Sequence, residues 1–296
     1  MKQLTVLSGK GGTGKTTIAA SFASLARNAV LADCDVDAPN LHMLLHPEVV
    51  GTEEFMGSKL AIIDGKECTK CGLCRERCRF GAITEEIAVD PLACEGCGVC
   101  MLVCPTGAVK MVERVSGQCY VSETKYGKMA HARLLPGQAN SGKLVTAVRQ
   151  KARLLAEKMK DGTIIIDGPP GIGCPVIASV TGVDLGLVVT EPTLSGIHDL
   201  DRALQLLEHF NVLPLVCVNM YDVNRLNTQR IVDYCKDKGV KVAGRIPFDL
   251  KVTEAMVRGE TITEYTPESP GARGIAATWN RVQATLLSLK EAKNCE

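Results

Sequence analysis

Short apolar runs alternate with longer amphipathic segments along most of the chain. The short runs suit strands of a parallel sheet that is buried on both faces, and the longer segments have helical composition. We expect strands at residues 4–7, 29–32, 163–166, 185–190, 212–219 and 240–246, and helices at residues 15–27, 141–160, 197–210, 225–238 and 273–289. This alternation implies βαβ crossovers, so the sequence predicts an α/β fold with a mostly parallel sheet flanked by helices.

The middle of the chain breaks this alternation. Between about residues 60 and 111 the composition shifts to cysteine, glycine and charge, and residues 112–135 resemble neither part clearly. No low-complexity linker separates the parts. We therefore predict one α/β domain made of residues 1–60 and 112–296, interrupted by a small α+β domain at residues 61–111.

Residues 9–17, GKGGTGKTT, form a glycine-rich loop between the first predicted strand and the first predicted helix. Gly9, Gly14, Lys15 and Thr16 complete the pattern G-x-x-x-x-G-K-[ST]. In such loops the backbone N–H groups face phosphate oxygens, the lysine adds charge and the threonine binds magnesium. The N-terminus of the following helix adds partial positive charge. The loop therefore predicts phosphate binding.

A dinucleotide site is the alternative interpretation of the same loop. Gly9, Gly11 and Gly14 also satisfy G-x-G-x-x-G, and Asp33 lies at about the distance expected of a ribose-binding acid. A dinucleotide loop has no use for the adjoining Lys15 and Thr16, whereas a nucleoside triphosphate with its Mg²⁺ needs both. The pair favours the triphosphate.

Acidic residues follow two of the predicted strands. Asp33, Asp35 and Asp37 come after the strand at 29–32, and Asp167 follows the strand at 163–166 and precedes the turn sequence GPPG. In open α/β sheets, ligands bind at the carboxyl ends of the strands. These carboxylates are therefore candidates for the same site as the glycine-rich loop.

Eight of the 14 cysteines lie between positions 68 and 104, in a segment that repeats itself after 26 residues. Each repeat has the spacing C-x2-C-x2-C-x3-C of two-cluster ferredoxins, in which the fourth cysteine of each repeat ligates the other cluster. We expect one [4Fe-4S] cluster on Cys68, Cys71, Cys74 and Cys104, and the other on Cys94, Cys97, Cys100 and Cys78. Arg79 stands where this motif usually has proline. Zinc is the alternative, because soft thiolates suit both metals, but the consecutive two-residue gaps favour iron and sulfur.

Charge and hydropathy exclude some partners. The chain has 34 basic and 33 acidic residues, a balance that provides no strong field for nucleic acid. It shows neither a signal peptide nor an apolar run of membrane length. We therefore expect a cytoplasmic protein without a nucleic-acid or membrane partner. Cys119 and Cys295 lie outside the repeats. Their sequence context does not decide whether they are metal ligands at a dimer interface.

The loop is more specific than a general phosphate loop, because Lys10 gives it the form K-G-G-x-G-K-T-T. In this it resembles the deviant Walker A ATPases, which include MinD, ParA, the nitrogenase iron protein and the Mrp-type iron–sulfur carriers. Together with the cysteine repeats, the chain looks like the members of the MinD superfamily that carry an inserted ferredoxin domain. The resemblance covers nearly the whole chain.

The resemblance implies roles for the loop residues. Lys10 would reach across a nucleotide-sandwich dimer to the partner's phosphates, Lys15 would bind the β and γ phosphates, Thr16 would bind Mg²⁺ and Thr17 would contact the α phosphate. The implied nucleotide-binding loop is Gly9, Lys10, Gly11, Gly12, Thr13, Gly14, Lys15, Thr16 and Thr17.

The resemblance also implies roles for residues outside the loop. Asp35 would orient or activate the attacking water near the metal, with Asp33 and Asp37 as alternatives, and Asp167 would hold Mg²⁺ through water. Asn219 would read the adenine. Pro247 and Asp249, in the segment IPFD, would lie in a loop beneath the base.

The expected function is ATP hydrolysis coupled to electron transfer. ATP would close a homodimer, or a heterodimer with a related ATPase, and electrons would pass through the two [4Fe-4S] clusters to a redox protein. One alternative is an ATP-dependent assembly or carrier factor that delivers iron–sulfur units to a metallocluster acceptor. Another is a positioning ATPase of the MinD or ParA kind.

Overall fold

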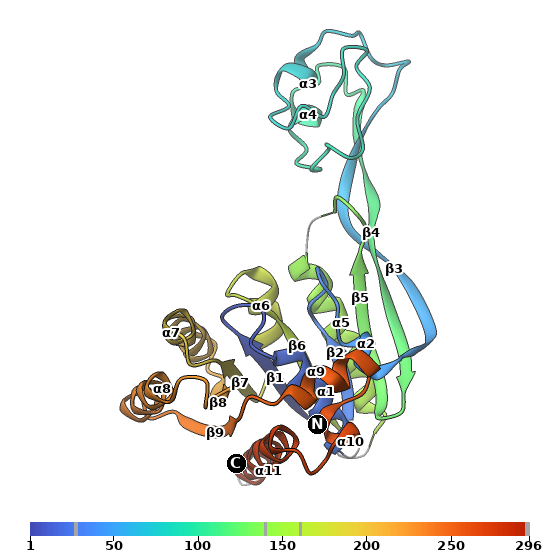
Figure 1. Cartoon of the computed structure of the whole chain (residues 1–296). Helices are drawn as coiled ribbons and strands as arrows, with labels where there is room; N and C mark the ends of the chain where they lie inside the picture. The colour runs from blue at the N-terminus through green and yellow to red at the C-terminus, as the bar shows by residue number, and fades with distance from the viewer. Residues whose placement is uncertain (27–28, 139–140, 160–161, 294–296) are drawn as a thin grey trace. The chain divides into compact units, whose positions relative to one another are not determined.

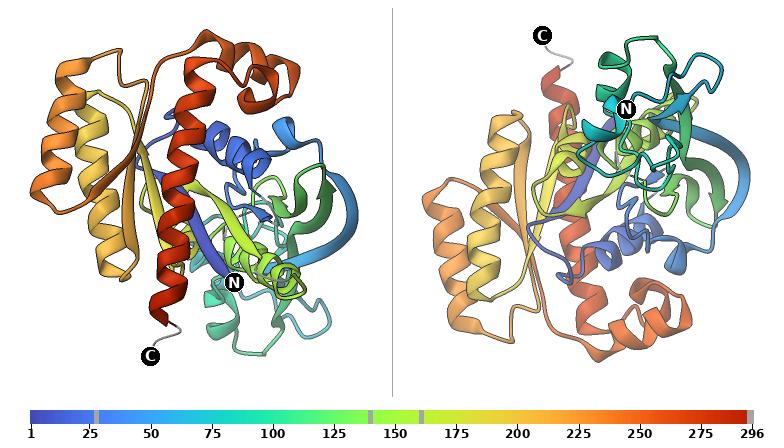
Figure 2. Two further views of the ribbon diagram at one scale, coloured as in Figure 1. Left: turned by 90° about the horizontal axis from the view of Figure 1, so that it is seen from below. Right: turned by 90° about the horizontal axis from the view of Figure 1, so that it is seen from above.

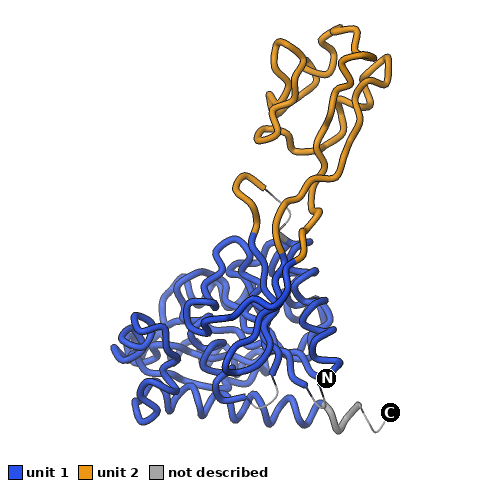
Figure 3. The backbone as a smooth tube through the Cα atoms, turned by 90° about the vertical axis from the view of Figure 1, so that its right-hand side faces the viewer, with its two compact units in different colours: residues 1–52, 119–133, 141–296 blue, residues 53–118, 134–140 orange. Residues whose placement is uncertain are grey.

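The computed structural model describes residues 1–26, 29–138, 141–159 and 162–293. The chain divides into two compact units (Figure 3). Unit 1 consists of Met1–Thr52, Cys119–Arg133 and Ser141–Glu296, and unit 2 of Glu53–Gln118 and Leu134–Asn140. The predicted insert at 61–111 lies inside unit 2, which begins earlier in the sequence, ends later and takes in a second segment.

A mostly parallel sheet organises the α/β part, as predicted. Within the described residues its nine strands have the order β3-β4-β5-β2-β6-β1-β7-β8-β9 (Figure 1). The strands are β1 (Lys2–Ser8), β2 (Ala29–Asp33), β3 (Glu48–Ile63), β4 (Val109–Thr124), β5 (Gly127–Leu134), β6 (Thr163–Pro170), β7 (Leu185–Thr190), β8 (Leu213–Asn219) and β9 (Lys241–Ile246). β1 is central, with β6 and β7 parallel on its two sides. Its carboxyl end therefore lies beside those of two other strands.

Helices cover both faces of this sheet (Figure 2). In unit 1 they are α1 (Lys15–Leu25), α2 (His42–Leu45), α5 (Ser141–Glu157), α6 (Cys174–Val180), α7 (Leu194–His209), α8 (Arg225–Asp237), α9 (Leu250–Arg258), α10 (Ile262–Tyr265) and α11 (Pro270–Lys293). Phe22 of α1 packs on Trp279 of α11 with ring centroids 5.0 Å apart. Both side chains belong to the main core, together with the buried faces of β1 and β7. This packing fixes α1, and hence the loop that precedes it.

Three strands, β3, β4 and β5, appear where the sequence predicted none. β3 and β4 are 16 residues long, and most of β3 is exposed. An exposed strand has no buried face and therefore shows no regular alternation of apolar and polar residues, so the sequence of β3 did not indicate a strand. The end of the predicted strand at 163–166 and the turn expected after Asp167 also need correction. Asp167 and Gly168 are buried within β6, which extends to Pro170, and α6 begins at Cys174.

The two cysteine repeats of unit 2 also have similar backbone structure. Its two short helices, α3 (Leu73–Glu76) and α4 (Val99–Leu102), follow Gly72 and Gly98, which occupy the same place in each repeat. These glycines have φ angles of 81° and 79°, a left-handed conformation that favours glycine. The duplication in the sequence is therefore a duplication of local structure.

One prediction concerns His131 in β5, whose ring stacks on Tyr120 and lies 2.8 Å from the Ser122 hydroxyl. Burial, and secondarily the charge of His42, lower the pKa of His131 to about 4. Between pH 6.5 and 4 the imidazole of His131 therefore binds a proton more readily in the unfolded chain than in the folded chain. The free energy of unfolding falls as the pH falls. Denaturant titrations measure the free energy of unfolding. Between pH 7 and 5 we expect this free energy to fall by about 1 kcal/mol less in His131→Phe than in the parent protein, after allowance for solvent screening.

The matched control is His209→Phe at the exposed end of α7. This variant should keep the pH slope of the parent protein, because it leaves the buried His131 in place. Equal slopes for all three proteins would contradict the role given to His131.

Candidate functional site

The glycine-rich loop joins the end of β1 at Ser8 to the start of α1 at Lys15. Its backbone is in close contact with other segments. A Cβ atom on Gly9 would lie 2.3 Å from Cβ of Asp199, and one on Gly14 would lie 2.4 Å from Nδ2 of Asn219. A side chain at Gly9 would push the loop away from α7, and one at Gly14 would displace the Asn219 amide and be strained at a φ of 86°.

Lys15 and Asp167 form an ion pair inside the site. Nζ of Lys15 lies 3.0 Å from Oδ1 of Asp167, and both side chains are buried. The other carboxylate oxygen of Asp167 is buried without a hydrogen-bond partner. A buried carboxylate oxygen without a donor is costly unless a cation or water binds it, and carboxylate oxygens suit Mg²⁺. The arrangement fits the metal role predicted for Asp167.

Asp33 and Asp35 lie close to this pair. Asp33 is opposite Asp167 in the pairing of β2 with β6, and its carboxylate accepts hydrogen bonds from the backbone N–H groups of Asp35 and Leu41, at 3.1 and 3.3 Å. Burial, and then the charge of Asp167, hold the pKa of Asp33 well above its usual value. Both Asp33 oxygens are thus occupied by the fold, which leaves Asp35 the better candidate for contact with a ligand.

Asp35 itself is partly buried. One of its oxygens accepts a hydrogen bond from the Ala38 N–H at 3.4 Å. Burial raises the pKa of its carboxyl, while the positive charge of Lys15 opposes that shift. Lys15 is therefore close to three carboxyl groups, those of Asp33, Asp35 and Asp167, and a bound cation would stabilise their ionised forms.

The structure places Lys10 against residues that carried no role in the sequence. Its Nζ lies 2.6 Å from Oε1 of Glu191 and 3.0 Å from Oγ of Ser195, both in the same chain. The segment Glu191-Pro192-Thr193 follows β7, the strand beside β1. Only this strand order brings Glu191 to the loop, so its local sequence held no signal.

The residues predicted to surround the adenine have partners within the fold. Asn219 donates a hydrogen bond from Nδ2 to the Thr13 carbonyl at 2.8 Å, and thereby supports the loop. Asp249 caps α9 by accepting from the Lys251 N–H at 2.9 Å, and it also accepts from the Gly271 N–H at 2.9 Å. Pro247 lies in the same segment, just after β9. Their roles toward a base stay predictions.

Two cavities in unit 2 are each lined by four of the repeat cysteines. One is lined by Cys68, Cys71, Cys74 and Cys104 with Ile63, Ile87 and Val109 among their neighbours. The other is lined by Cys78, Cys94, Cys97 and Cys100 with Phe80, Ala82 and Ile83 among theirs. Each cavity thus takes three cysteines from one repeat and the fourth from the other.

These eight cysteines are free thiols. In the part of the chain that the structure describes, no group of three or more His, Cys, Asp and Glu side chains is placed to hold a single metal ion. Of the other cysteines, Cys119 is buried and Cys174 is exposed at the start of α6, while Cys295 lies outside the described residues. No described helix is both long and apolar enough to span a membrane.

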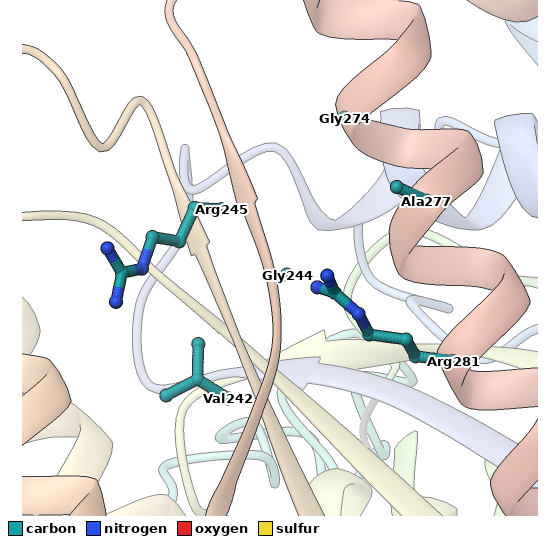
Figure 4. A pocket seen from close by; sticks show the side chains of 6 residues that line it. All are labelled: Val242, Gly244, Arg245, Gly274, Ala277 and Arg281. Atoms are coloured by element: carbon teal, nitrogen blue, oxygen red, sulfur yellow. The ribbon is translucent and has the colours of Figure 1, made fainter.

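A further cavity lies in unit 1, between the edge strand β9 and α11. It is lined by Val242, Gly244, Arg245, Gly274, Ala277 and Arg281 (Figure 4). Arg281 donates a hydrogen bond to the Ala243 carbonyl at 2.7 Å and so covers part of the exposed strand edge. The cavity has no nucleophile or carboxylate among its lining residues, and we assign the chemistry to the glycine-rich loop instead.

Known proteins resemble this chain over most of its length. The profile of the CobQ/CobB/MinD/ParA nucleotide binding domain matches residues 4–262. The uncharacterized protein MJ0578 of Methanocaldococcus jannaschii is 36% identical over 253 residues, which cover 84% of this chain and 86% of that protein. The septum site-determining protein MinD of Bacillus subtilis is 23% identical over 269 residues, which cover 88% and 81%.

Solved structures show the same fold. MinD of Pyrococcus horikoshii, complexed with Mg-ADP, superposes with a TM-score of 0.58 at 18% sequence identity, covering 95% of each chain. The fold is that of an α/β P-loop NTPase, as the sequence predicted. The family profile, the relatives and the fold agree, and the chain therefore belongs to the CobQ/CobB/MinD/ParA family of nucleotide-binding proteins.

Proposed function

We propose that this protein is an ATP-hydrolysing iron–sulfur protein in which ATP-dependent closure of a dimer controls electron transfer through two [4Fe-4S] clusters. The observation that carries the proposal is the pair of four-cysteine cavities in unit 2. The same chain carries the glycine-rich loop with Lys15 and Asp167 in unit 1. A nucleotide site and two redox sites in one chain are what such coupling requires.

The nucleotide part rests on the loop and the carboxylates around Lys15. In P-loop NTPases the loop backbone and its lysine bind the β and γ phosphates, while Mg²⁺ is held by the loop Ser/Thr and a Walker B aspartate. Thr16 and Asp167 fit those two metal roles here, and the unpartnered Asp167 oxygen supports the second. Asp35 would orient the attacking water. The Mg-ADP complex of the MinD with the same fold supports this use of the site.

The cluster part rests on how the cysteines are shared. A single Zn²⁺ has Zn–S bonds of about 2.3 Å and draws its four ligands to one point. Each cysteine set instead lines a cavity with apolar walls, and each exchanges its fourth cysteine as in two-cluster ferredoxins. Bound clusters would supply one-electron transfer. The cysteines would hold them, and the apolar walls, such as Ile63 and Phe80, would limit access of water.

The partners follow from both parts. Lys10 belongs to a motif whose lysine acts on the nucleotide of a second subunit, so the proposal includes a homodimer or a heterodimer with a related ATPase. Electrons would go to a redox protein. Cations opposite the transferring phosphoryl group stabilise its charge, so a lysine delivered by a partner would make hydrolysis depend on dimer closure.

Anaerobic purification tests the proposal. Iron and sulfide would be counted, and cluster reduction by dithionite would be followed by absorbance without nucleotide, with ADP and with a non-hydrolysable ATP analogue. We expect two clusters per chain and a change in reduction rate of about tenfold with the analogue, within the usual range of coupling between sites. Lys15→Ala, which should not bind the analogue, serves as the control. Clusters that respond identically in all three conditions would contradict coupling.

A further inference from the structure

Among the described residues, Glu191 is the one anionic group that contacts Lys10. The function proposed above gives Glu191 no role. The side chains of Lys10 and Glu191 are 33% and 15% exposed, so their 2.6 Å ion pair is partly shielded from water. Ser195 adds a hydrogen bond to the same Nζ at 3.0 Å. The lysine is thus held at two points by its own chain.

The position of Glu191 is determined by the start of α7. Thr193 is the N-cap of this helix, and its hydroxyl oxygen accepts a hydrogen bond from the Gly196 N–H at 3.0 Å. The same hydroxyl lies 3.3 Å from Oε1 of Glu191, the oxygen that contacts Lys10. Helix capping therefore orients the carboxylate toward the lysine.

The backbone of the loop is held against the same helix. The α-carbon of Gly9 faces Asp199 so closely that a Cβ would lie 2.3 Å from the Asp199 Cβ. A helix N-terminus carries partial positive charge and repels a cation. The ammonium group of Lys10 therefore needs the Glu191 carboxylate to remain at this end of α7.

We propose that Glu191 is a positioning residue that keeps Lys10 on its own subunit until an ATP-bound second subunit takes its place as the anionic partner. The inference rests on the dimer of the proposed function. In the dimer, the phosphates of the partner's ATP replace the carboxylate at Nζ of Lys10. A nucleotide shifts such an equilibrium only through its different affinity for the two states, and the γ-phosphate of ATP supplies negative charge that ADP lacks. Glu191 thus raises the threshold for closure and makes it selective for ATP.

The size of the effect follows from the exposure of the pair. A partly exposed ion pair changes an equilibrium by about fivefold at most. A symmetric dimer releases two such lysines, so removing the carboxylate from both subunits strengthens dimer formation by up to about 25-fold. Ser195 remains available to Lys10 in the variant, which keeps the change confined to the carboxylate.

Sedimentation of the anaerobically purified protein tests this inference. Glu191→Gln would be compared with the parent and with Glu208→Gln, an exposed glutamate near the other end of the same helix. With the ATP analogue we expect the dimer dissociation constant to fall by up to about 25-fold in Glu191→Gln and to stay unchanged in Glu208→Gln. With ADP, Glu191→Gln should form some dimer where the parent forms none.

The outcomes separate this inference from the proposed function. If the parent dimerises with the analogue and Glu191→Gln has the same dissociation constant, the role of Glu191 is wrong and the proposed dimer stands. If neither protein dimerises with any nucleotide, both ideas are wrong. Dimerisation of Glu191→Gln alone would support a carboxylate that holds the lysine more tightly than we expect.

A second measurement addresses the contact in the monomer. Acetic anhydride would label the amines of the protein without nucleotide, and mass spectrometry would follow the Lys10 peptide relative to the other lysine peptides. We expect Lys10 to react several-fold faster in Glu191→Gln, because its amine no longer has to leave a carboxylate first. Equal rates in the two proteins would overturn the inference whatever the oligomeric state.

Discussion

Lys10→Ala should lower ATP hydrolysis about 10³-fold while leaving ATP binding nearly intact. A cation that reaches the transferring phosphoryl group from a partner subunit, like an arginine finger, contributes about 10³- to 10⁵-fold to turnover. Lys10 lies against Glu191 and Ser195 of its own chain, whereas Lys15 contacts Asp167 inside the site. Phosphate release would measure turnover, and a fluorescent ATP analogue would measure binding. Lys15→Ala is the comparison, and this variant should no longer bind ATP.

Mixing two inactive variants tests whether Lys10 acts in its own subunit or in the other. Lys10→Ala would be mixed with Asp35→Asn, which lacks the carboxylate proposed to orient water. In a mixed dimer, the site of the Lys10→Ala subunit keeps its own Asp35 and receives Lys10 from the partner. Activity should therefore recover to about one intact site per mixed dimer. No recovery on mixing would show that the lysine acts within its own chain.

Paired cysteine variants should show which residues share a cluster. Cys104→Ala should lower the iron content from about eight to about four per chain, because one [4Fe-4S] cluster loses a thiolate. Adding Cys68→Ala should change nothing further, since both residues line the same cavity. Adding Cys94→Ala instead should remove nearly all iron, because Cys94 lines the other cavity. Iron and sulfide analysis after anaerobic purification measures each result.

The opposite pattern would contradict the exchange of cysteines between repeats. If each repeat held its own cluster, Cys104→Ala with Cys94→Ala would leave about four irons, and Cys104→Ala with Cys68→Ala would leave none. Cys174→Ala is the control, because this exposed cysteine belongs to unit 1 and to neither cavity. It should retain the iron of the parent protein.

The sequence predicted the elements whose signals are local. The strand at 185–190 was predicted with the bounds that the structure has, and β1, β2, β6, β8 and β9 were predicted to within a few residues. Their apolar runs are long enough to be seen because both faces of the sheet are covered. β3 was missed because most of its residues are exposed, so no buried face imposes a pattern. β4 and β5 were missed because their buried positions are scattered among polar ones and form no continuous apolar run. α6 was missed because glycines and prolines precede it.

The site shows the same division. The glycine-rich loop and the cysteine spacing lie in contiguous segments, so the sequence alone determined the chemistry each can perform, phosphate binding and thiolate ligation. The pairs that position this chemistry are far apart in the chain. Lys15 meets Asp167 because β1 lies beside β6, and Lys10 meets Glu191 because β1 also lies beside β7. Strand order depends on the packing of the whole sheet, and so only the tertiary structure decided that Lys10 has a carboxylate partner within its own chain.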